Sequence, residues 1–198
     1  MQRLLLGIGV LAVIAVSIGT LTAGAVTSKP LVAVQVDEFS VFPGTQGAPA
    51  GKVRFVEGET ELTPDEAISQ VFWIAPDLEF YGELTAFENL DFFLRARVMA
   101  KSKEEIRAGL SSCGLWKREG DRTGSYSSGM KQRLKIALAG LCQPRVLLLD
   151  EPGNNLDSEG TALLENFFKQ TKAQMITFWA TNHPQETKHA DFQLELGK

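Results

Sequence analysis

Cysteine and positive charge are both scarce in this sequence, and each shortage narrows what the protein can be. The 198-residue chain has two cysteines, Cys113 and Cys142, whose number and spacing form neither a disulfide framework nor a zinc site. We therefore expect two reduced, buried thiols, as in a cytosolic protein. The formal net charge is −4, so the chain lacks the basic footprint of a nucleic-acid-binding protein, and we expect no nucleic acid partner.

Charge is also missing from the start of the chain, where residues 4–26 are rich in Leu, Ile, Val, Ala and Gly. About 20 apolar residues suffice to span a bilayer. Three interpretations of residues 1–30 stay open: a membrane anchor or uncleaved signal, a cleaved secretory signal, and a buried pair of strands. Arg3 and Lys29 flank the apolar stretch evenly, so the positive-inside rule sets no orientation.

The most informative stretch is SYSSGMKQRLKIALAGLCQPRVLLLDEPGNNLD. A polar loop at residues 126–129 precedes a helix expected over about 130–141, whose free backbone N–H groups would attract an anion such as phosphate. The apolar run at 145–149 has the length and the lack of alternation of a buried parallel strand. That strand would deliver Asp150 and Glu151 to its carboxyl end, where open α/β sheets bind their ligands.

This stretch resembles the ATP-binding-cassette (ABC) ATPases. YSSGMKQR is similar to the signature motif of that family, LSGGQ followed by QR, with differences at Tyr126, Ser128 and Met130. LLLDEP is similar to the family's Walker B strand with its glutamate, and Leu156-Asp157 is similar to its D-loop. The order and spacing of the three motifs together carry the resemblance, which covers about residues 50–198.

The resemblance implies roles for the residues around these motifs. Ser127, Ser128 and Gly129 would hold a γ-phosphate at the helix N-terminus. Asp150 would be an outer ligand of Mg²⁺, and Glu151 would act as a general base or polariser for the attacking water.

Two further residues and the partners are implied in the same way. His183 follows an apolar strand and resembles the family's switch histidine, which would hydrogen-bond the γ-phosphate, and Asp157 would lie at a dimer seam. The implied cofactors are ATP and Mg²⁺. The implied partners are a second ABC cassette, paired head to tail as a homodimer or heterodimer, and a transmembrane transporter subunit. These partners place the protein at the cytoplasmic face of a membrane.

Two motifs of the family are missing from this sequence. The P-loop, G-x-x-x-x-G-K-[ST], surrounds phosphates with N–H groups and a lysine. The nearest match is at residues 19–24, which have the glycine spacing. Ala25 and Val26 then stand in the places of the lysine and the Ser or Thr. The family's Q-loop glutamine is replaced by Pro76 or Asp77. We therefore expect the chain to bind ATP weakly and hydrolyse little of it alone, while completing the site of an intact partner cassette.

From residue 50 onward, expected strands and helices alternate, as in a parallel sheet. Strands are expected over residues 51–55, 69–74, 145–149, 175–180 and 192–196. The resemblance implies an α/β, P-loop NTPase-like fold with helices on both faces of a parallel sheet and an ABC-type helical subdomain over about 81–124. Residues 1–49 are expected to form a separate apolar segment and linker, and residues 50–198 the ABC ATPase-like domain. Over residues 27–50 the spacing of apolar residues predicts no helix or strand.

Capping pairs mark three expected helix starts: Thr63 with Glu66, Thr85 with Glu88, and Ser102 with Glu105. The helix after Thr85 carries an apolar stripe at helical spacing, made of Phe87, Leu90, Leu94 and Val98. Phe92 and Phe93 lie to one side of that stripe. This aromatic face is either core or, as the resemblance suggests, a groove for the coupling helix of a membrane partner.

Two other interpretations of the whole chain stay open. One is a membrane-anchored, non-catalytic interaction protein that keeps the helical subdomain as a docking module, which the apolar N-terminus and the Pro76-Asp77 departure favour. The other is a shifted reading frame or wrong start before Gly51, which would have removed a normal P-loop.

Overall fold

The computed structural model describes residues 32–40, 50–57, 59–75, 77–171, 174–181, 186 and 190. They belong to two compact units, one ending at Gln70 and one beginning at Val71. Several predictions lie outside the described residues: the apolar segment with its glycine string, the loop at 43–49, His183, and the edge strand at 192–196. The predicted division between residues 49 and 50 stays a prediction.

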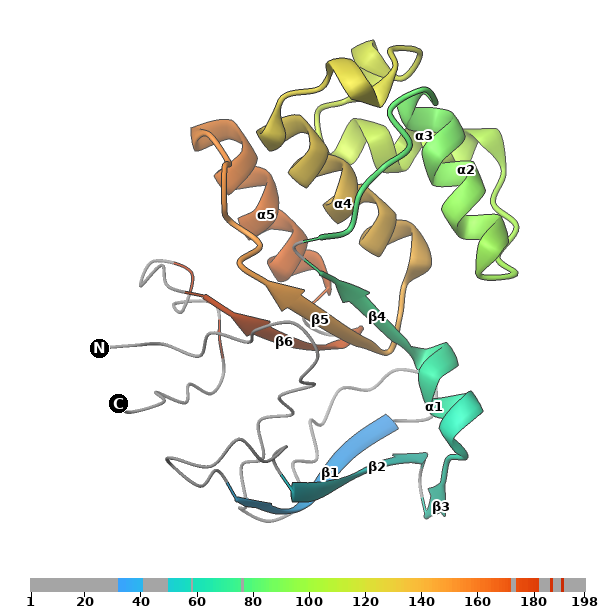
Figure 1. Cartoon of the computed structure of the whole chain (residues 1–198), viewed down its shortest axis with the longest axis vertical. Coiled ribbons are helices and arrows are strands. Elements are labelled where there is room, and N and C mark those ends of the chain that lie inside the picture. The colour runs from blue at the N-terminus through green and yellow to red at the C-terminus, as the bar shows by residue number, and fades with distance from the viewer. Residues whose placement is uncertain are drawn as a thin grey trace. The chain divides into compact units, whose positions relative to one another are not determined.

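The first unit contains an antiparallel sheet with the strand order β1-β2-β3 (Figure 1). Its strands are β1 (Val32–Ser40), β2 (Ala50–Glu57) and β3 (Thr60–Glu61). The strand predicted over residues 51–55 is confirmed. No strand was predicted over residues 27–50, and this was wrong for β1. Seven of its nine residues pair with β2, with Val36 opposite Val53 and an irregularity between Asp37 and Ser40.

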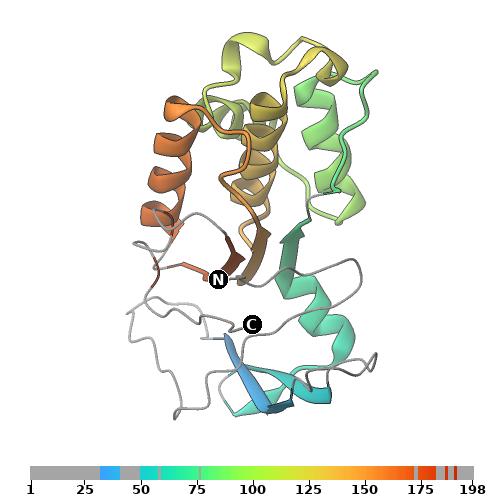
Figure 2. The ribbon, with the colours of Figure 1, turned by 60° about the vertical axis from the view of Figure 1, so that its left-hand side comes forward.

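Helix α1 (Pro64–Gln70) follows this sheet in the sequence (Figure 2). Its predicted start is confirmed, because the Glu66 carboxylate accepts the Thr63 N–H at 2.9 Å and the Thr63 hydroxyl accepts the Glu66 N–H at 3.4 Å. The helix continues to Gln70, so the strand predicted to begin at Ser69 begins two residues later, at Val71.

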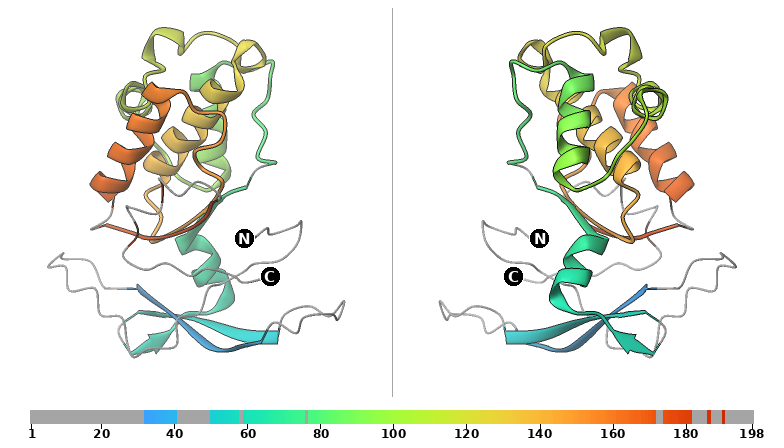
Figure 3. Two further views of the ribbon diagram at one scale, coloured as in Figure 1. Left: turned by 90° about the vertical axis from the view of Figure 1, so that its left-hand side faces the viewer. Right: turned by 90° about the vertical axis from the view of Figure 1, so that its right-hand side faces the viewer.

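The second unit contains a parallel sheet with the strand order β4-β5-β6. Its strands are β4 (Val71–Ile74), β5 (Val146–Asp150) and β6 (Ile176–Ala180). Helices α4 (Ser128–Cys142) and α5 (Ser158–Thr171) precede β5 and β6, and both lie on the same face of the sheet (Figures 1 and 3). The α/β fold with a parallel sheet is confirmed. A helix on the opposite face is not among the described residues of this unit.

The core of the second unit connects the sheet to the helices. Leu147 of β5 and Leu134 and Leu138 of α4 are fully buried in it. Because β5 is central, with β4 and β6 hydrogen-bonded on either side, its carboxyl end lies between two other strand ends. This arrangement fixes the position of Asp150, the last residue of the strand.

Helices α2 (Ala86–Ala96) and α3 (Lys103–Ser112) and the 3-10 turns η1 (Trp116–Arg118) and η2 (Thr123–Ser125) form the predicted helical region. Both helices begin with complete capping boxes, as predicted. Gly114, with φ +68°, follows α3, and the Leu115 N–H donates to the Leu110 carbonyl at 2.8 Å. This left-handed position ends the helix.

One side chain of the predicted apolar stripe differs from expectation, and the aromatic face beside the stripe divides between core and surface. Val98 is 95% exposed and has φ +58°, because α2 ends at Ala96, so its placement on the stripe was wrong. Phe92 is 45% exposed, whereas Phe93 is partly buried against the core. The aromatic face is thus only partly core.

Cys113 and Cys142 are free and buried, as predicted. Burial raises the pKa of each thiol to about 11, so both are protonated at neutral pH. Among the helices of the described residues, none combines the length and the apolarity that a membrane crossing needs. The predicted anchor lies outside those residues.

Candidate functional site

The start of α4 is a helix end with a single polar cap. Ser127 has extended backbone angles, φ −64° and ψ 162°, and its hydroxyl accepts the Met130 N–H at 3.2 Å. The helix begins at Ser128, two residues before the predicted start. Its first turn contains no acidic residue, so no carboxylate of that turn competes for the N–H groups of Ser128 and Gly129. This end can therefore accept an external anion.

Tyr126 anchors the loop in front of this helix. Its ring is buried, and its hydroxyl donates to the Arg118 carbonyl at 2.6 Å. Burial raises the pKa of the phenol, so it stays protonated and remains a donor. The tyrosine that stands in the place of the signature leucine thus fixes the position of Ser127 relative to η1.

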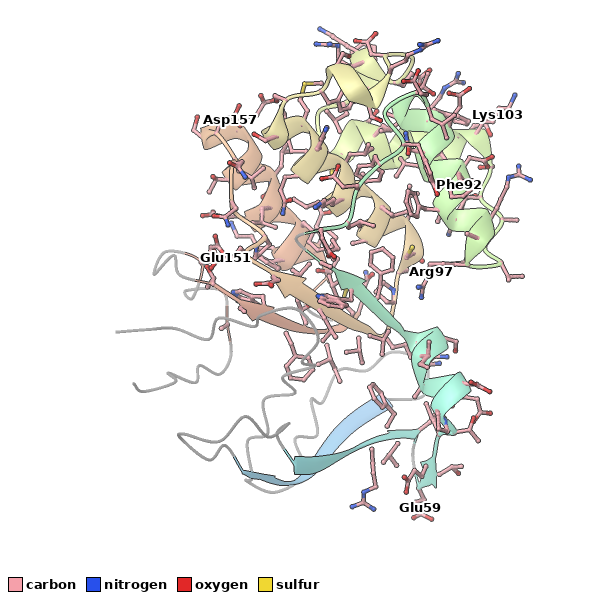
Figure 4. All side chains as sticks on the ribbon, in the orientation of Figure 1. Glu59, Phe92, Arg97, Lys103, Glu151 and Asp157 are labelled. Carbon is pink, nitrogen blue, oxygen red and sulfur yellow. The ribbon has the colours of Figure 1, made fainter. Side chains whose placement is uncertain are left out.

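The carboxyl end of β5 presents two adjacent acids. Asp150 is the last residue of the strand and is half-buried, and Glu151 follows it at the strand end in Figure 4. Burial, followed by the charge of Glu151, raises the pKa of Asp150. The Glu151 N–H donates to the Ala180 carbonyl at 2.9 Å, which ties the acid pair to the end of β6.

The acidic turn, residues 151–155, has an unusual backbone. Glu151 has φ +47° and Asn155 has φ +62°, both in the left-handed region that non-glycine residues rarely occupy. The Asn154 N–H donates to the Glu151 carbonyl at 3.1 Å and closes the turn. Such conformations persist only where surrounding contacts hold them, and they gather at functional sites.

Asp157 follows the acidic turn and lies at the start of α5 (Figure 4). Its carboxylate accepts the Gly160 N–H at 2.8 Å, and its carbonyl accepts the Thr161 N–H at 2.9 Å. Asp157 is exposed and therefore also available to a partner, but the contacts within the chain are those of a helix cap.

The start of α4 and the acidic turn are packed together. A Cβ atom on Gly129 would lie 2.7 Å from the Asn155 carbonyl oxygen, so only glycine fits this approach without movement of the turn. The Gln132 side-chain amide donates to the Pro152 carbonyl at 2.9 Å. The structure therefore joins the signature residues to the turn that carries Glu151, whereas His183 lies outside the described residues.

The donor set can be tested for magnesium. In the part of the chain that the structure describes, no group of three or more His, Cys, Asp or Glu residues could hold a metal ion alone. Two adjacent carboxylates, one with a raised pKa, instead suit a hard cation that keeps several waters and is shared with phosphates. Asp150 and Glu151 fit that description.

Lys135 was missed in the sequence. Only 7% of this residue is exposed, and its Nζ donates to the Ala75 carbonyl at 3.4 Å, just beyond β4. The signal was a single charge inside the otherwise apolar run LKIALAG. Gln132 matches the signature pattern in the sequence, but that match does not predict its contact with Pro152.

A family model described as ABC transporter matches residues 39–154, more than half of the chain. The chain belongs to the ABC transporter family. It is similar to the phosphate import ATP-binding protein PstB of Pyrobaculum aerophilum, with 38% identity over 124 residues, which cover 58% of this chain and 50% of that protein. It is also similar to the bacitracin transport ATP-binding protein BcrA of Enterococcus faecalis, with 40% identity over 105 residues, covering 52% and 34%.

A solved structure supports the same fold for this ABC family member. The chain is similar to an ATP-binding subunit of an ABC transporter, with a TM-score of 0.58 and 23% identity, covering 71% of this chain and 61% of the other. At that identity the likeness concerns the fold alone. The chain spans about half the length of the PstB relative.

Proposed function

We propose that this protein is an ABC transporter ATP-binding subunit whose signature loop acts on ATP held by a second cassette, coupling ATP binding and hydrolysis to membrane transport. The observation that supports this most is the joint placement of the α4 N-terminus and the acidic turn. Gly129 abuts Asn155, and Gln132 is bonded to Pro152. An anion-accepting helix end and a carboxylate pair therefore belong to one local structure.

Each residue would make a defined contribution. The N–H groups of Ser128 and Gly129 would donate to a phosphate, and Ser127 would complete the polar rim of that site. Asp150 would hold Mg²⁺ through its oxygen, and Glu151 would orient a water and accept its proton. When bound, Mg²⁺-ATP supplies the phosphoanhydride whose cleavage depends mainly on positioned charge.

Two more residues belong to the proposal. His183 would hydrogen-bond the γ-phosphate, and the exposed Asp157 would lie at the seam between cassettes. The cap that Asp157 provides to α5 supports the second role, since it holds a solvent-facing carboxylate in a fixed position.

The chain alone would bind ATP weakly, because its sequence has no recognisable P-loop lysine. ATP titration of the purified full chain tests this expectation, and micromolar affinity of the monomer would contradict it.

The pairing is tested with a purified ABC cassette that has an intact P-loop and an inactivated signature serine. Adding this chain should restore ATP hydrolysis to that cassette, and Ser127→Arg should reduce the restoration strongly. Glu151→Gln should change ATP hydrolysis by the isolated chain very little.

The further partner would be a transmembrane subunit, which places the protein at the cytoplasmic face of the membrane. Tyr81 and Phe92 support this proposal because they are 53% and 45% exposed and meet edge to face, with ring centroids 5.1 Å apart. Exposed aromatic side chains are common at binding surfaces. The domain division at residues 1–49 and 50–198, with the helical subdomain at 81–124, is part of the same proposal.

The same aromatic pair favours a second candidate, a membrane-anchored interaction protein without catalysis. In that case the helical region would dock a partner, and Asp150 and Glu151 would have no substrate. Membrane fractionation together with the restoration assay separates the two candidates. A membrane-bound chain that never restores ATP hydrolysis would favour the second.

A further inference from the structure

One side of α4 donates two side-chain hydrogen bonds to the turns at the carboxyl edge of the parallel sheet. Gln132 reaches the turn after β5, and Lys135 reaches the turn after β4. We propose that Gln132 and Lys135 are positioning residues that clamp both turns to α4, the helix that follows the signature loop. The clamp would make the signature loop, which acts on a partner's nucleotide, and the acidic turn move together. This inference rests on the proposed function.

The Gln132 contact is short and well placed. Its Nε2 lies 2.9 Å from the carbonyl oxygen of Pro152, a residue that is fully buried. Pro152 follows Glu151, whose left-handed backbone needs support from its surroundings. Since the Glu151 N–H is already bonded to Ala180, the Gln132 bond holds the turn from its other side. Two fixed points on either side of Glu151 restrict where its carboxylate can lie.

The Lys135 contact lies three residues further along α4, on the same side of the helix. Its Nζ donates to the Ala75 carbonyl at 3.4 Å, and Ala75 directly follows β4. Burial lowers the pKa of the ammonium, whereas the charges of Glu79 and Asp77 raise it and that of Lys131 lowers it further. Burying a lysine in the protein core costs free energy unless its ammonium is hydrogen-bonded. If this position only filled space in the core, an apolar residue would avoid that cost. We therefore explain Lys135 by its hydrogen bond to Ala75, which holds the turn after β4 against α4.

The strand register brings the two turns together. Ile74 pairs with Leu149, so Ala75, which follows β4, and Asp150, the last residue of β5, lie at the same edge of the sheet. In the sequence, Pro76 and Asp77 follow Ala75 in place of the Q-loop glutamine of the family. In this chain, Lys135 links the turn after β4 to α4.

Amide hydrogen exchange of the full chain, without nucleotide, tests the clamp. Gln132→Met should accelerate exchange of the Glu151, Asn154 and Leu156 amides by about fivefold or more, with α4 and β5 unchanged. Lys135→Met should do the same for the Leu78 amide, which donates to Ala75, and Lys135→Arg should restore protection. Lys131→Met, the matched change on the same helix, should leave both turns unchanged.

Opposite results would overturn the inference. These are unchanged exchange in both turns, or acceleration spread evenly over α4 and β5, which would indicate general destabilisation. If Gln132→Met does not fold, Gln132→Glu keeps the side-chain size and removes the donor, and the same outcomes apply.

The restoration assay separates this inference from the proposed function. If the wild-type chain restores hydrolysis to the serine-inactivated cassette and the two Met variants restore it about fivefold less, the clamp is supported. Equal restoration by wild type and variants would overturn the clamp alone. Failure of the wild-type chain would overturn the proposed function, while the exchange measurements would still decide whether the clamp exists.

Discussion

Helices α2 and α4 begin with the same kind of cap but have different surroundings. In α2, the Thr85 hydroxyl accepts the Glu88 N–H at 3.1 Å and the Glu88 carboxylate accepts the Thr85 N–H at 2.8 Å. In α4, the Ser127 hydroxyl caps Met130, but a methionine cannot return the second bond. The N-terminus of α2 is therefore closed by its own carboxylate, and that of α4 is left open to an external anion.

The difference shows that the N-terminus of a helix can either be capped by its own carboxylate, which stabilises the helix, or stay open to bind an external anion. A carboxylate in the first turn favours the helix through the macrodipole, but it also repels phosphate. Helix α3, with Ser102 and Glu105, is closed in the same way as α2. Of these three helices, only α4 lacks an acidic residue in its first turn, and it is the one that contacts the acidic turn.

The largest expected effect concerns the closed start of α2. Asn89 is fully buried, and its amide oxygen accepts the Tyr81 N–H at 2.9 Å while its amide nitrogen donates to the Thr123 hydroxyl at 3.2 Å. Asn89→Ala should lower the free energy of unfolding by about 2–4 kcal/mol, because it leaves buried polar groups unpaired. Urea denaturation measures this. The exposed Asn166→Ala should change little, and equal effects of the two variants would contradict the structural role.

The second prediction concerns the open start of α4. Ser127→Arg should reduce restoration of ATP hydrolysis in the paired assay by about tenfold or more, since a bulky cation would fill the phosphate site. Ser102→Arg removes a serine cap from α3 and should reduce stability without reducing restoration. The comparison between helix starts would fail if both arginine variants lost activity equally.

The third prediction converts the open start into a closed one. Met130→Glu would complete the capping box with Ser127, so the thermal midpoint should rise slightly while restoration of ATP hydrolysis falls severalfold. Met130→Gln could return the same bond without charge and should keep restoration near the wild-type level. A glutamate variant that restores hydrolysis as well as the glutamine variant would show that the helix end does not meet an anion.

The smallest expected effect concerns the carboxylate pair. The raised pKa of Asp150 means that the folded state binds its proton more tightly than the unfolded state, so its charge destabilises the fold above the folded pKa. Asp150→Asn should therefore raise the thermal midpoint by a few degrees at neutral pH, and the gain should disappear as the pH falls below the unfolded pKa. A gain that is the same at acidic and neutral pH would show that charge is not the cause.

Much of the fold could be predicted because its signals are local. The capping pairs at Thr63, Thr85 and Ser102 place a cap and its carboxylate three residues apart, and all three mark observed helix starts. The unalternating apolar run before Asp150 identified the central strand of the parallel sheet. Val98 was misplaced because the apolar spacing continued past the residue at which the backbone left the helix.

Other features depend on distant partners and were not predictable. Strand β1 forms because it pairs along β2, an antiparallel contact that no spacing within residues 32–40 announces. The left-handed backbone of Glu151 is likewise invisible in the motif LLLDEP, because it depends on the bond to Ala180 from the next strand.

The sequence by itself determined the order of the motifs, the helix starts and the position of two adjacent acids after an apolar strand. Only the tertiary structure decided that Gly129 abuts Asn155, that Gln132 holds Pro152, and that Lys135 reaches Ala75, 60 residues away in the chain. The physical reason is range: caps and turns are formed by neighbours in sequence, whereas the clamp between helix and strand ends exists only after the helix has packed on the sheet.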